Sequence, residues 1–241
     1  VLLSTELGQM KYRQLQLRRN HSSSVPNSID IYTPIYGQYL PELPLFINTE
    51  EQQRYFALNL QDQIFLNDQW SVLFGARFDH VTQDFQNKLT DTSSKKDLQQ
   101  TSPRLGLNYR LNDRWSWYAN YGESFALNSG MDRNGDVFNP EKGKSYEIGG
   151  KYRITSQSLL SLALFKMDKE NVLTTDPTDS NYQITAGEVS SKGLEVDLET
   201  QLNDQFSIRA NYSYTDAQVE KDQILAKGSR LSNVPKHSGS I

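Results

Sequence analysis

Three carboxylates stand at alternate positions late in the chain: Glu195, Asp197 and Glu199. On a β-strand this spacing places them on one face, with neighbours roughly 7 Å apart. That distance is within the range of the carboxylate pairs of inverting glycosidases. The water-filled interior of a β-barrel also requires such a polar wall. We favour this second interpretation, in which the three carboxylates are solvated and line a lumen, and keep glycosidase chemistry as its alternative.

Other candidate reactive groups do not form a site in the sequence. Asp132 and Asp136 are spaced as at the start of a calcium loop, but Val137 and Gly143 stand where glycine and glutamate are needed. The three histidines, His21, His80 and His237, lie in unrelated segments. Neither a nucleotide-binding glycine pattern nor a nucleophile with a matched base is present. We therefore expect no enzyme, no protein-bound metal and no organic cofactor.

Composition restricts the class of protein further. Hydrophobic residues make up 36% of the 241 residues and aromatic residues 11%, against roughly 45–50% apolar residues in ordinary globular chains. Lysine and arginine are scattered and the net charge is −4, so no nucleic-acid partner is indicated. The absence of cysteine leaves the compartment open. No apolar run reaches the ~20 residues of a transmembrane helix, whereas barrel strands need only ~9–11 residues with alternate side chains in lipid.

The strongest pattern is alternation of apolar and polar residues with a period of two, which predicts strands with one apolar and one polar face. It recurs along the whole chain, with some exceptions: Leu73 breaks it, Tyr118 falls on a polar face, and the stretch 159–167 is apolar on both faces. The segments that carry it are 70–78, 103–111, 114–122, 145–152, 194–199 and 206–214.

Short polar turns separate these strands at 67–68, 112–113, 155–156 and 203–204. We attribute them to Asn and Asp, which tolerate the left-handed backbone of tight hairpins. Longer polar connections are predicted near 87–100, 128–142, 173–188 and 218–231. A propeller blade also repeats about every 45 residues, but it holds four short strands where this repeat holds two long ones. Alternating short and long connections are typical of an outer-membrane barrel.

Aromatic residues lie close to the short turns. Trp70 and Trp115 follow two of them at the same distance, Phe206 follows the turn at 203–204, and the apolar Leu66 precedes the turn at 67–68. Amphipathic rings at this level are expected at the membrane–water boundary. Closure of the end of a soluble barrel is the alternative interpretation.

Six successive segments resemble barrel strands of TonB-dependent siderophore receptors. They are 58–64 (LNLQDQI), 74–79 (FGARFD), 102–107 (SPRLGL), 118–125 (YANYGESF), 140–149 (PEKGKSYEIG) and 191–196 (SKGLEV). A further segment, 29–37 (IDIYTPIYG), is similar to a surface loop of ferrichrome and related hydroxamate receptors. The resemblance runs in order from about residue 50 to the end of the chain.

The resemblance implies an all-β, antiparallel, up-and-down transmembrane β-barrel of about 22 strands with short periplasmic turns and long extracellular loops. It also implies the outer membrane of a Gram-negative bacterium, an N-terminal plug domain, energy from the inner-membrane TonB complex, and a ferric siderophore as cargo. We expect residues 1–241 to be part of that barrel domain, with roughly nine or ten strands and with the plug and the C-terminal strands missing. Such a piece should not transport alone.

Two groups of residues are candidates for function. We expect lumen-lining roles for Arg104, Asn108, Glu147, Glu195, Asp197, Glu199 and Arg209. Contact with the siderophore is expected from the loop aromatics Tyr32, Tyr36, Tyr39 and Phe138, since aromatic faces give rigid contact area. The iron would arrive inside this ligand and not as a cofactor. The expected partners are the siderophore, the TonB complex through the missing N-terminal region, and membrane lipid.

Two rival functions remain open. A passive porin-like barrel would share the wall pattern and lack an upstream plug and TonB-contacting segment. A soluble β-propeller or carbohydrate-binding module would give a monodisperse product without detergent.

Overall fold

The computed structural model describes residues 1–18, 31–37 and 42–241. Ten β-strands account for most of this part of the chain. Their bounds are β1 (Leu2–Leu17), β2 (Leu45–Phe65), β3 (Trp70–Asn87), β4 (Thr92–Arg110), β5 (Trp115–Ala126), β6 (Glu141–Thr155), β7 (Ser158–Thr175), β8 (Gln183–Gln201), β9 (Ser207–Lys221) and β10 (His237–Ser240).

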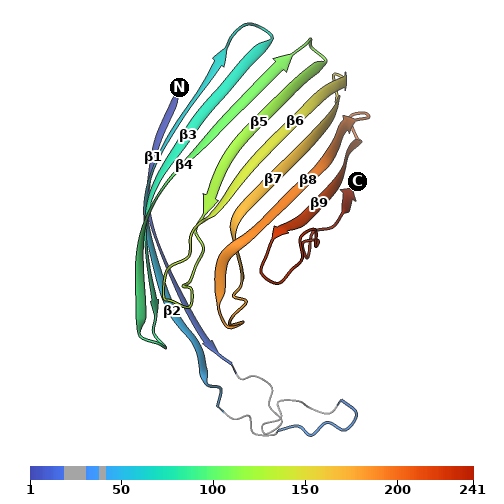
Figure 1. The fold of residues 1–241 in the computed structure, drawn as a ribbon. Helices are drawn as coiled ribbons and strands as arrows, with labels where there is room; N and C mark the ends of the chain where they lie inside the picture. Colours follow the sequence, from blue (N-terminus) through green and yellow to red (C-terminus); the bar gives the residue numbers. More distant parts are fainter. Residues whose placement is uncertain (19–30, 38–41) are drawn as a thin grey trace.

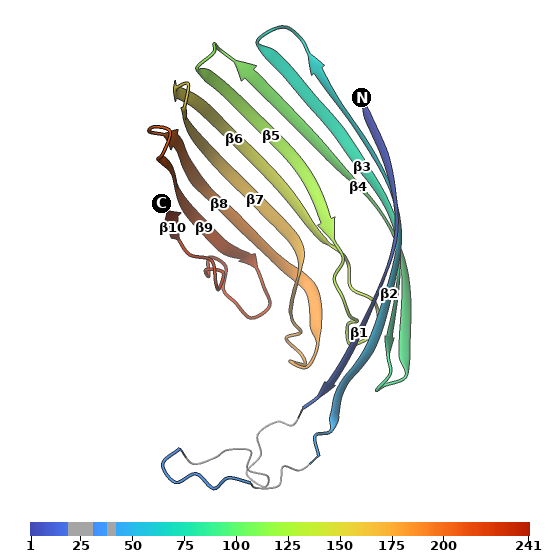
Figure 2. The same cartoon turned by 180° about the vertical axis from the view of Figure 1, so that it is seen from behind.

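The strands form one antiparallel sheet in which each strand pairs with its neighbours in sequence, from β1 to β10. Figures 1 and 2 show this sheet from its two sides as a curved wall whose edges are β1 and β10. The up-and-down order and the strand number confirm the predicted arrangement. Among the described residues, no helix is long and apolar enough to cross a membrane.

Apolar side chains are concentrated on the outer, convex face of the wall. Leu105, Ile148 and Leu164 keep 53%, 58% and 52% of their surface exposed. Ile148 is paired with Ala119 on one side and Leu164 on the other, so apolar residues run across the strands in rows. Exposure of so many large apolar side chains is unfavourable in water and is expected of a surface that contacts lipid.

The short turns lie where the sequence predicted them, but the reason given for them was wrong. Left-handed φ values among described non-glycine residues occur at Asp91, Asn171 and Asn233, none of them in a short turn. Instead the side chain of the turn residue accepts hydrogen bonds from the backbone. The Asn112 Oδ1 accepts from the amides of Arg114 and Trp115 at 2.9 and 3.0 Å. Asn67 and Asn203 accept equivalent pairs, and Thr155 accepts from one amide. These are turns closed by side chains.

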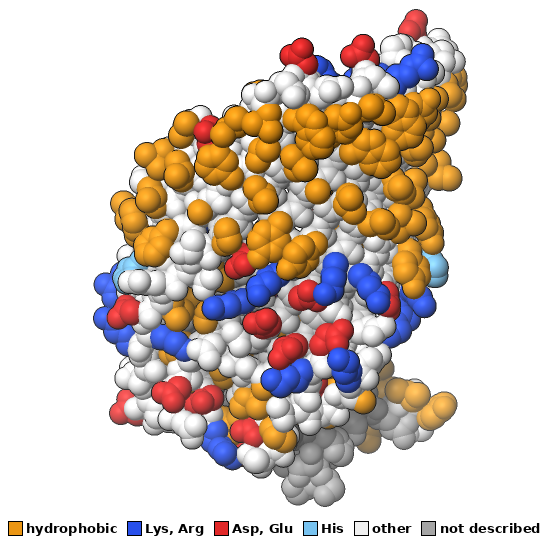
Figure 3. Space-filling view, turned by 45° about the horizontal axis from the view of Figure 1, so that its top comes forward, with side chains coloured by type: hydrophobic (Ala, Val, Ile, Leu, Met, Phe, Trp, Pro, Cys, Tyr) orange, Lys and Arg blue, Asp and Glu red, His pale blue; other side chains and the backbone are white. Residues whose placement is uncertain are grey.

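Aromatic rings form a belt on the outer face beside the short turns. Trp70 stacks on Tyr109 and Trp115 on Tyr152, each with ring centroids 4.3 Å apart, and Trp117 lies 5.7 Å from Trp115. Figure 3 shows the wider apolar band that begins here and a zone of mixed charge farther from the short turns. The order of turn, aromatic belt, apolar band and charged zone is the depth profile of a membrane-spanning wall.

The strands continue well beyond the apolar band toward the long-connection end. β2 has 21 residues and β4 has 19, about twice the ~9–11 needed to span lipid. The predicted connection at 87–100 was therefore wrong, because only residues 88–91 lie between β3 and β4. The connections at 127–140 and 222–236 remain long, whereas 176–182 is shorter than predicted. These strand ends were predicted as connections because their residues are mainly polar.

Candidate functional site

The seven predicted lumen-lining residues all lie on the inner, concave face of the wall. Strand register gives this result directly, because residues paired across neighbouring strands share a face. Asn108 is paired with Ser71 and Tyr118, and Glu147 with Asn120. Glu195 lies in the row of Asn108, and Arg104, Asp197, Glu199 and Arg209 fall in neighbouring rows of the same face. The structure therefore brings them together on one surface.

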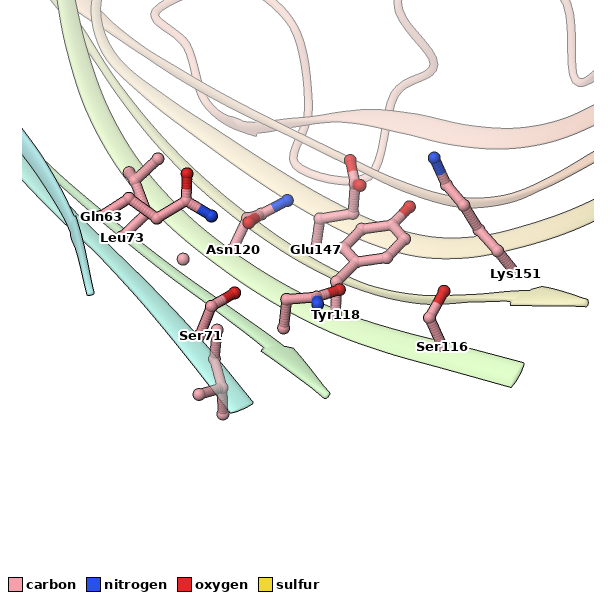
Figure 4. Close-up of a pocket in the computed structure, with 11 residues that line it drawn as sticks. Gln63, Ser71, Leu73, Ser116, Tyr118, Asn120, Glu147 and Lys151 are labelled. Atoms are coloured by element: carbon pink, nitrogen blue, oxygen red, sulfur yellow. The ribbon is translucent and has the colours of Figure 1, made fainter. Parts of the chain in front are cut away.

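A hollow of about 620 Å³ lies on this face near the short-turn end. Its lining comes from β2 to β6 and is mainly polar: Gln63, Ser71, Asn108, Ser116, Tyr118, Asn120, Glu147 and Lys151, with Leu73, Gly106 and Leu107. Figure 4 shows Tyr118 and Glu147 side by side, with Lys151 farther along the wall. The residues that broke the sequence pattern, Leu73 and Tyr118, belong to this lining.

The lining of the hollow holds one acidic and one basic residue, Glu147 and Lys151, and further carboxylates lie along the same face. Glu147 lies on β6, the strand beside that of Tyr118, while Glu195 and Asp197 lie on β8, in the row of Tyr118 and the neighbouring row of the same face. Glu199 is separate from them and is paired with Arg209, with 2.9 Å between nitrogen and oxygen. Of the three carboxylates predicted to lie in line, Glu195 and Asp197 stay in the acidic group, whereas Glu199 forms an exposed ion pair. Such a group suits a basic partner surface.

The short side chains of the inner face leave room for the longer ones. A Cβ added to Gly75 would lie 3.1 Å from the Arg104 Nε. Arg104 therefore lies over Gly75, and its guanidinium donates to the Asn59 carboxamide on β2. A Cβ on Gly149 would meet the Tyr118 ring at 2.4 Å. These glycines let polar side chains lie flat along the wall.

The stretch 159–167, which is apolar on both faces, is now oriented. Leu160, Leu162 and Leu164 point outward in the rows of Tyr152, Gly150 and Ile148. Phe165 is paired with Glu147 and Gly193, so it lies on the inner face. The ring occupies the space left by Gly193, where a Cβ would meet it at 2.7 Å.

A second cavity of about 490 Å³ lies at the long-connection end, where the 127–140 connection folds onto the inner face. Its lining combines apolar groups with amides and one guanidinium. The members include Phe46, Phe85, Met131, Arg133, Asn134, Phe138, Asn181, Tyr182 and Gln183. A pocket of mixed aromatic and amide character suits an organic ligand with carbonyl or hydroxamate oxygens.

The predicted ligand-contacting aromatics are spread over different places. Phe138 belongs to the second cavity but is 6% exposed, and its ring packs under Gly130. Tyr32 and Tyr36 lie in the connection between β1 and β2 and are 88% and 80% exposed. Tyr39 lies outside the described residues. Of the described three, Phe138 alone is among the lining residues of the cavity.

Sequence reasoning missed Phe46, Phe85 and Tyr182. Phe85 lies in the segment just before the wrongly predicted 87–100 connection, and Tyr182 ends the 176–182 turn. Aromatic residues within the predicted long connections, or just before them, were the signal that could have found them.

The Asp132 segment is a turn closed on itself. The Asp132 Oδ1 accepts from the amides of Asn134 and Asp136 at 2.8 and 3.0 Å. Over the described ranges, no group of three or more His, Cys, Asp or Glu residues has the arrangement of a metal site.

Sequence comparisons place the whole wall in one family. The family profile described as "TonB dependent receptor-like, beta-barrel" matches residues 3–241. The metal-pseudopaline receptor CntO of Pseudomonas aeruginosa (strain UCBPP-PA14) is 41% identical over 92% of this chain and 32% of its own length. The ferrioxamine B receptor of Salmonella typhimurium (strain SL1344) is 31% identical over 98% of this chain and 35% of its own length. The chain thus spans about a third of these relatives.

Solved structures agree on the fold. The ferric-catecholate import receptor Fiu of E. coli K12 superposes with a TM-score of 0.70 at 20% identity, over 98% of this chain and 38% of that one. The siderophore receptor PiuA of Acinetobacter baumannii gives 0.71 at 20% identity, over 86% and 33%. The family consists of transport receptors and not enzymes, so glycosidase chemistry for Glu195, Asp197 and Glu199 is set aside. The chain belongs to the TonB-dependent receptor family, as part of its Gram-negative outer-membrane β-barrel domain.

Proposed function

We propose that the protein containing this chain binds a ferric or related metal siderophore at its extracellular face and imports it with energy from the TonB complex. The observation that carries the proposal is the cavity of about 490 Å³ at the mouth of a lipid-facing wall. Two relatives above 30% identity, the metal-pseudopaline and ferrioxamine B receptors, are named for such ligands.

The chemistry of the cavity fits a chelate better than a bare ion. In a siderophore complex the chelator supplies the ligands of the metal, so the protein recognises an organic surface. Phe46 and Tyr182, which are 45% and 39% exposed, offer ring faces, and Asn134 and Asn181 offer amide hydrogen bonds. Phe85 lines the cavity as a buried ring, 9% exposed. Tyr32, Tyr36, Tyr39 and Phe138 remain proposed contacts. Tyr32 and Tyr36 are exposed, so a ligand can reach them from the solvent side.

The acidic part of the inner wall has a different role in this proposal. Glu147, Glu195 and Asp197, near the short-turn end, would hold a basic surface of a plug domain that closes the barrel. TonB would act on the N-terminal region of the receptor, and the resulting change in the plug would open a path along the polar wall. Arg104 and Asn108 belong to that path.

Iron uptake tests the proposal. The full-length receptor is expressed in a strain that lacks other siderophore receptors and is supplied with radiolabelled ferrioxamine B, ferrichrome or iron–pseudopaline. We expect uptake of at least one chelate, abolished by deletion of TonB. Uptake that persists without TonB, together with influx of unrelated small solutes, would instead identify a passive porin.

Replacement of Tyr32, Tyr36 and Tyr39 by alanine in the intact receptor tests their role in ligand contact. We expect weaker binding of the transported chelate by the purified variant. Unchanged affinity would remove these tyrosines from the site and leave the cavity around Phe85 as the candidate.

A further inference from the structure

We propose that the connection 127–140, here called the inner loop, is a fixed wall of the ligand cavity, and that Glu51 and Gln83 are positioning residues that seat it. This inference rests on the proposed function for its consequence in ligand binding, but the seating itself can be measured without any ligand.

The seat is a polar group on β2 and β3 that the inner loop covers. Glu51 is 3% exposed and Gln83 is fully buried at 0%. The Glu51 carboxylate accepts from the side-chain amides of Gln53 and Gln83 at 2.6 and 2.7 Å, and from the Ser129 hydroxyl of the inner loop. The Gln83 Nε2 also donates to the Asn128 carbonyl at 3.0 Å. Glu51 and Gln83 therefore bind Ser129 and Asn128 of the inner loop directly.

These donors to Glu51 are all neutral. A buried carboxylate satisfied by amide and hydroxyl hydrogen bonds is a costly arrangement, and its directional bonds fix the geometry of the groups that make it. The Gln83 Oε1 is buried and has no hydrogen-bond partner among the described residues, which is a cost that the two hydrogen bonds of Nε2 offset. Glu51 and Gln83 therefore define one position for Asn128 and Ser129.

The far end of the inner loop is held as well. Lys96 on β4 donates to the Val137 carbonyl at 3.2 Å and to the Asn139 Oδ1 at 2.8 Å. On the other side, Asn171, a left-handed residue at a bulge in β7, donates to the Pro140 carbonyl at 2.9 Å. Val137 and Phe138 are buried, at 5% and 6% exposure. The loop is clamped to three parts of the wall.

Strand pairing explains why a loop is needed here. β4 pairs with β5 from Arg104 to Arg110, and β5 ends at Ala126 while β4 continues to Thr92 beyond the membrane band. Among the described residues, the Thr92–Pro103 part of β4 thus has no strand partner on its β5 side. In Figure 1 the connection after β5 turns back toward the β2 side of the wall at this level. The inner loop fills the place of the missing strand ends.

The position of the loop forms the cavity. Ser129 to Gly135 and Phe138 supply one wall, and Phe46, Phe85 and Tyr182 lie on the others. A loop displaced from the seat would remove the first wall. We therefore expect Glu51 and Gln83 to affect affinity through the loop, although neither is among the lining residues.

Amide hydrogen exchange on the full-length receptor in lipid tests the seating. The variants are Glu51→Ala and Gln83→Leu, with the conservative Glu51→Gln. Glu50→Ala is the matched control, since its side chain lies on the outer face, where it is paired with Lys11 and Lys88. Loss of a hydrogen bond to a charged group predicts at least about tenfold faster exchange in residues 127–140. We expect this in Glu51→Ala and Gln83→Leu, a smaller change in Glu51→Gln, and none in Glu50→Ala.

Two outcomes would overturn the seating. In the first, the inner loop of the unmodified receptor exchanges as fast as the exposed 222–236 connection, which would identify a mobile lid. In the second, exchange in the inner loop is unchanged in Glu51→Ala. Retained protection in β2 and β3 shows that each variant is folded; if Glu51→Ala does not fold, Gln83→Leu and Glu51→Gln decide.

The binding arm uses ferrioxamine B and iron–pseudopaline with the same purified variants. We expect at least about tenfold weaker binding in Glu51→Ala and near-normal binding in Glu51→Gln and Glu50→Ala. Equal affinity in all variants would contradict the role of the loop in the cavity. Failure of the unmodified receptor to bind either chelate would count against the proposed function, while the exchange result would still decide the seating.

Discussion

An arginine at position 148 should destabilise the barrel strongly because Ile148 points into the hydrocarbon. On β6 the outward-facing residues run from Tyr152, in the aromatic belt, to Lys144, which is paired with the charged residues Glu123 and Asp168. At ~3.3 Å per residue and a tilt of 35–45°, this stretch crosses about 20 Å of depth, and Ile148 lies at its middle. Arginine near the midplane costs about 2–4 kcal/mol. The unfolding equilibrium should therefore shift roughly 30- to 800-fold.

The assay compares Ile148→Arg with Ile148→Ala and Ser145→Arg in the full-length receptor. Denaturant unfolding in lipid vesicles, followed by tryptophan fluorescence, gives the free energy of unfolding. The alanine variant measures the loss of apolar surface without the charge. Ser145 lies on the inner face of the same strand, where an arginine can reach water. Equal destabilisation by Ile148→Arg and Ser145→Arg would refute the assignment of the outer face to lipid.

Three further perturbations follow from particular interactions. Asn112→Ala removes two backbone hydrogen bonds of an exposed turn, so denaturant unfolding should show a loss of roughly 0.5–1.5 kcal/mol per bond. Trp115 stacks on Trp117 and Tyr152. Trp115→Ala should therefore lower the free energy of unfolding by roughly 0.5–1.5 kcal/mol for each of these aromatic pairs. Trp115→Tyr should retain most of the stability that the alanine variant loses. The Lys11 and Lys88 ammonium groups lower the pKa of Glu50 from 4.5 to about 2, so its stabilising effect, present above pH 4.5, is lost as the pH falls toward 2. The stability difference between the unmodified receptor and Glu50→Gln should vanish over that pH range, and a pH-independent difference would contradict the ion pairs.

The membrane-spanning part of the wall was predictable because one physical constraint acts on alternate residues. Because one face of each strand contacts lipid and the other contacts water, apolar and polar residues alternate along the strand. Leu105 and Ile148 follow this alternation. The turns were predictable from Asn67, Asn112 and Asn203, although their side chains act as hydrogen-bond acceptors. The inner-face residues could be assigned from the sequence because alternate positions of a strand lie on the same face.

The extracellular part was harder because water contacts the wall on both faces there. Residues 92–100 are polar except for Leu98, so a strand and a loop there have the same composition. The inward fold of the inner loop depends on Glu51 and Gln83, which lie 78 and 45 residues from the loop positions they bind. Contacts between such distant residues leave no local pattern. Phe138 was predicted to contact the ligand, and its burial could not be inferred from its place in a polar loop.

Collision measurements on spin labels placed one at a time along β6, from Ser145 to Gly150, show which face of the wall lies in lipid. In the full-length receptor in lipid, we expect labels at Tyr146, Ile148 and Gly150 to collide with dissolved oxygen, and labels at Ser145, Glu147 and Gly149 to be shielded from it. Oxygen concentrates in hydrocarbon, so this alternation would place the apolar face in the membrane. Uniform accessibility, or collision with a water-soluble nickel complex at Ile148, would contradict it.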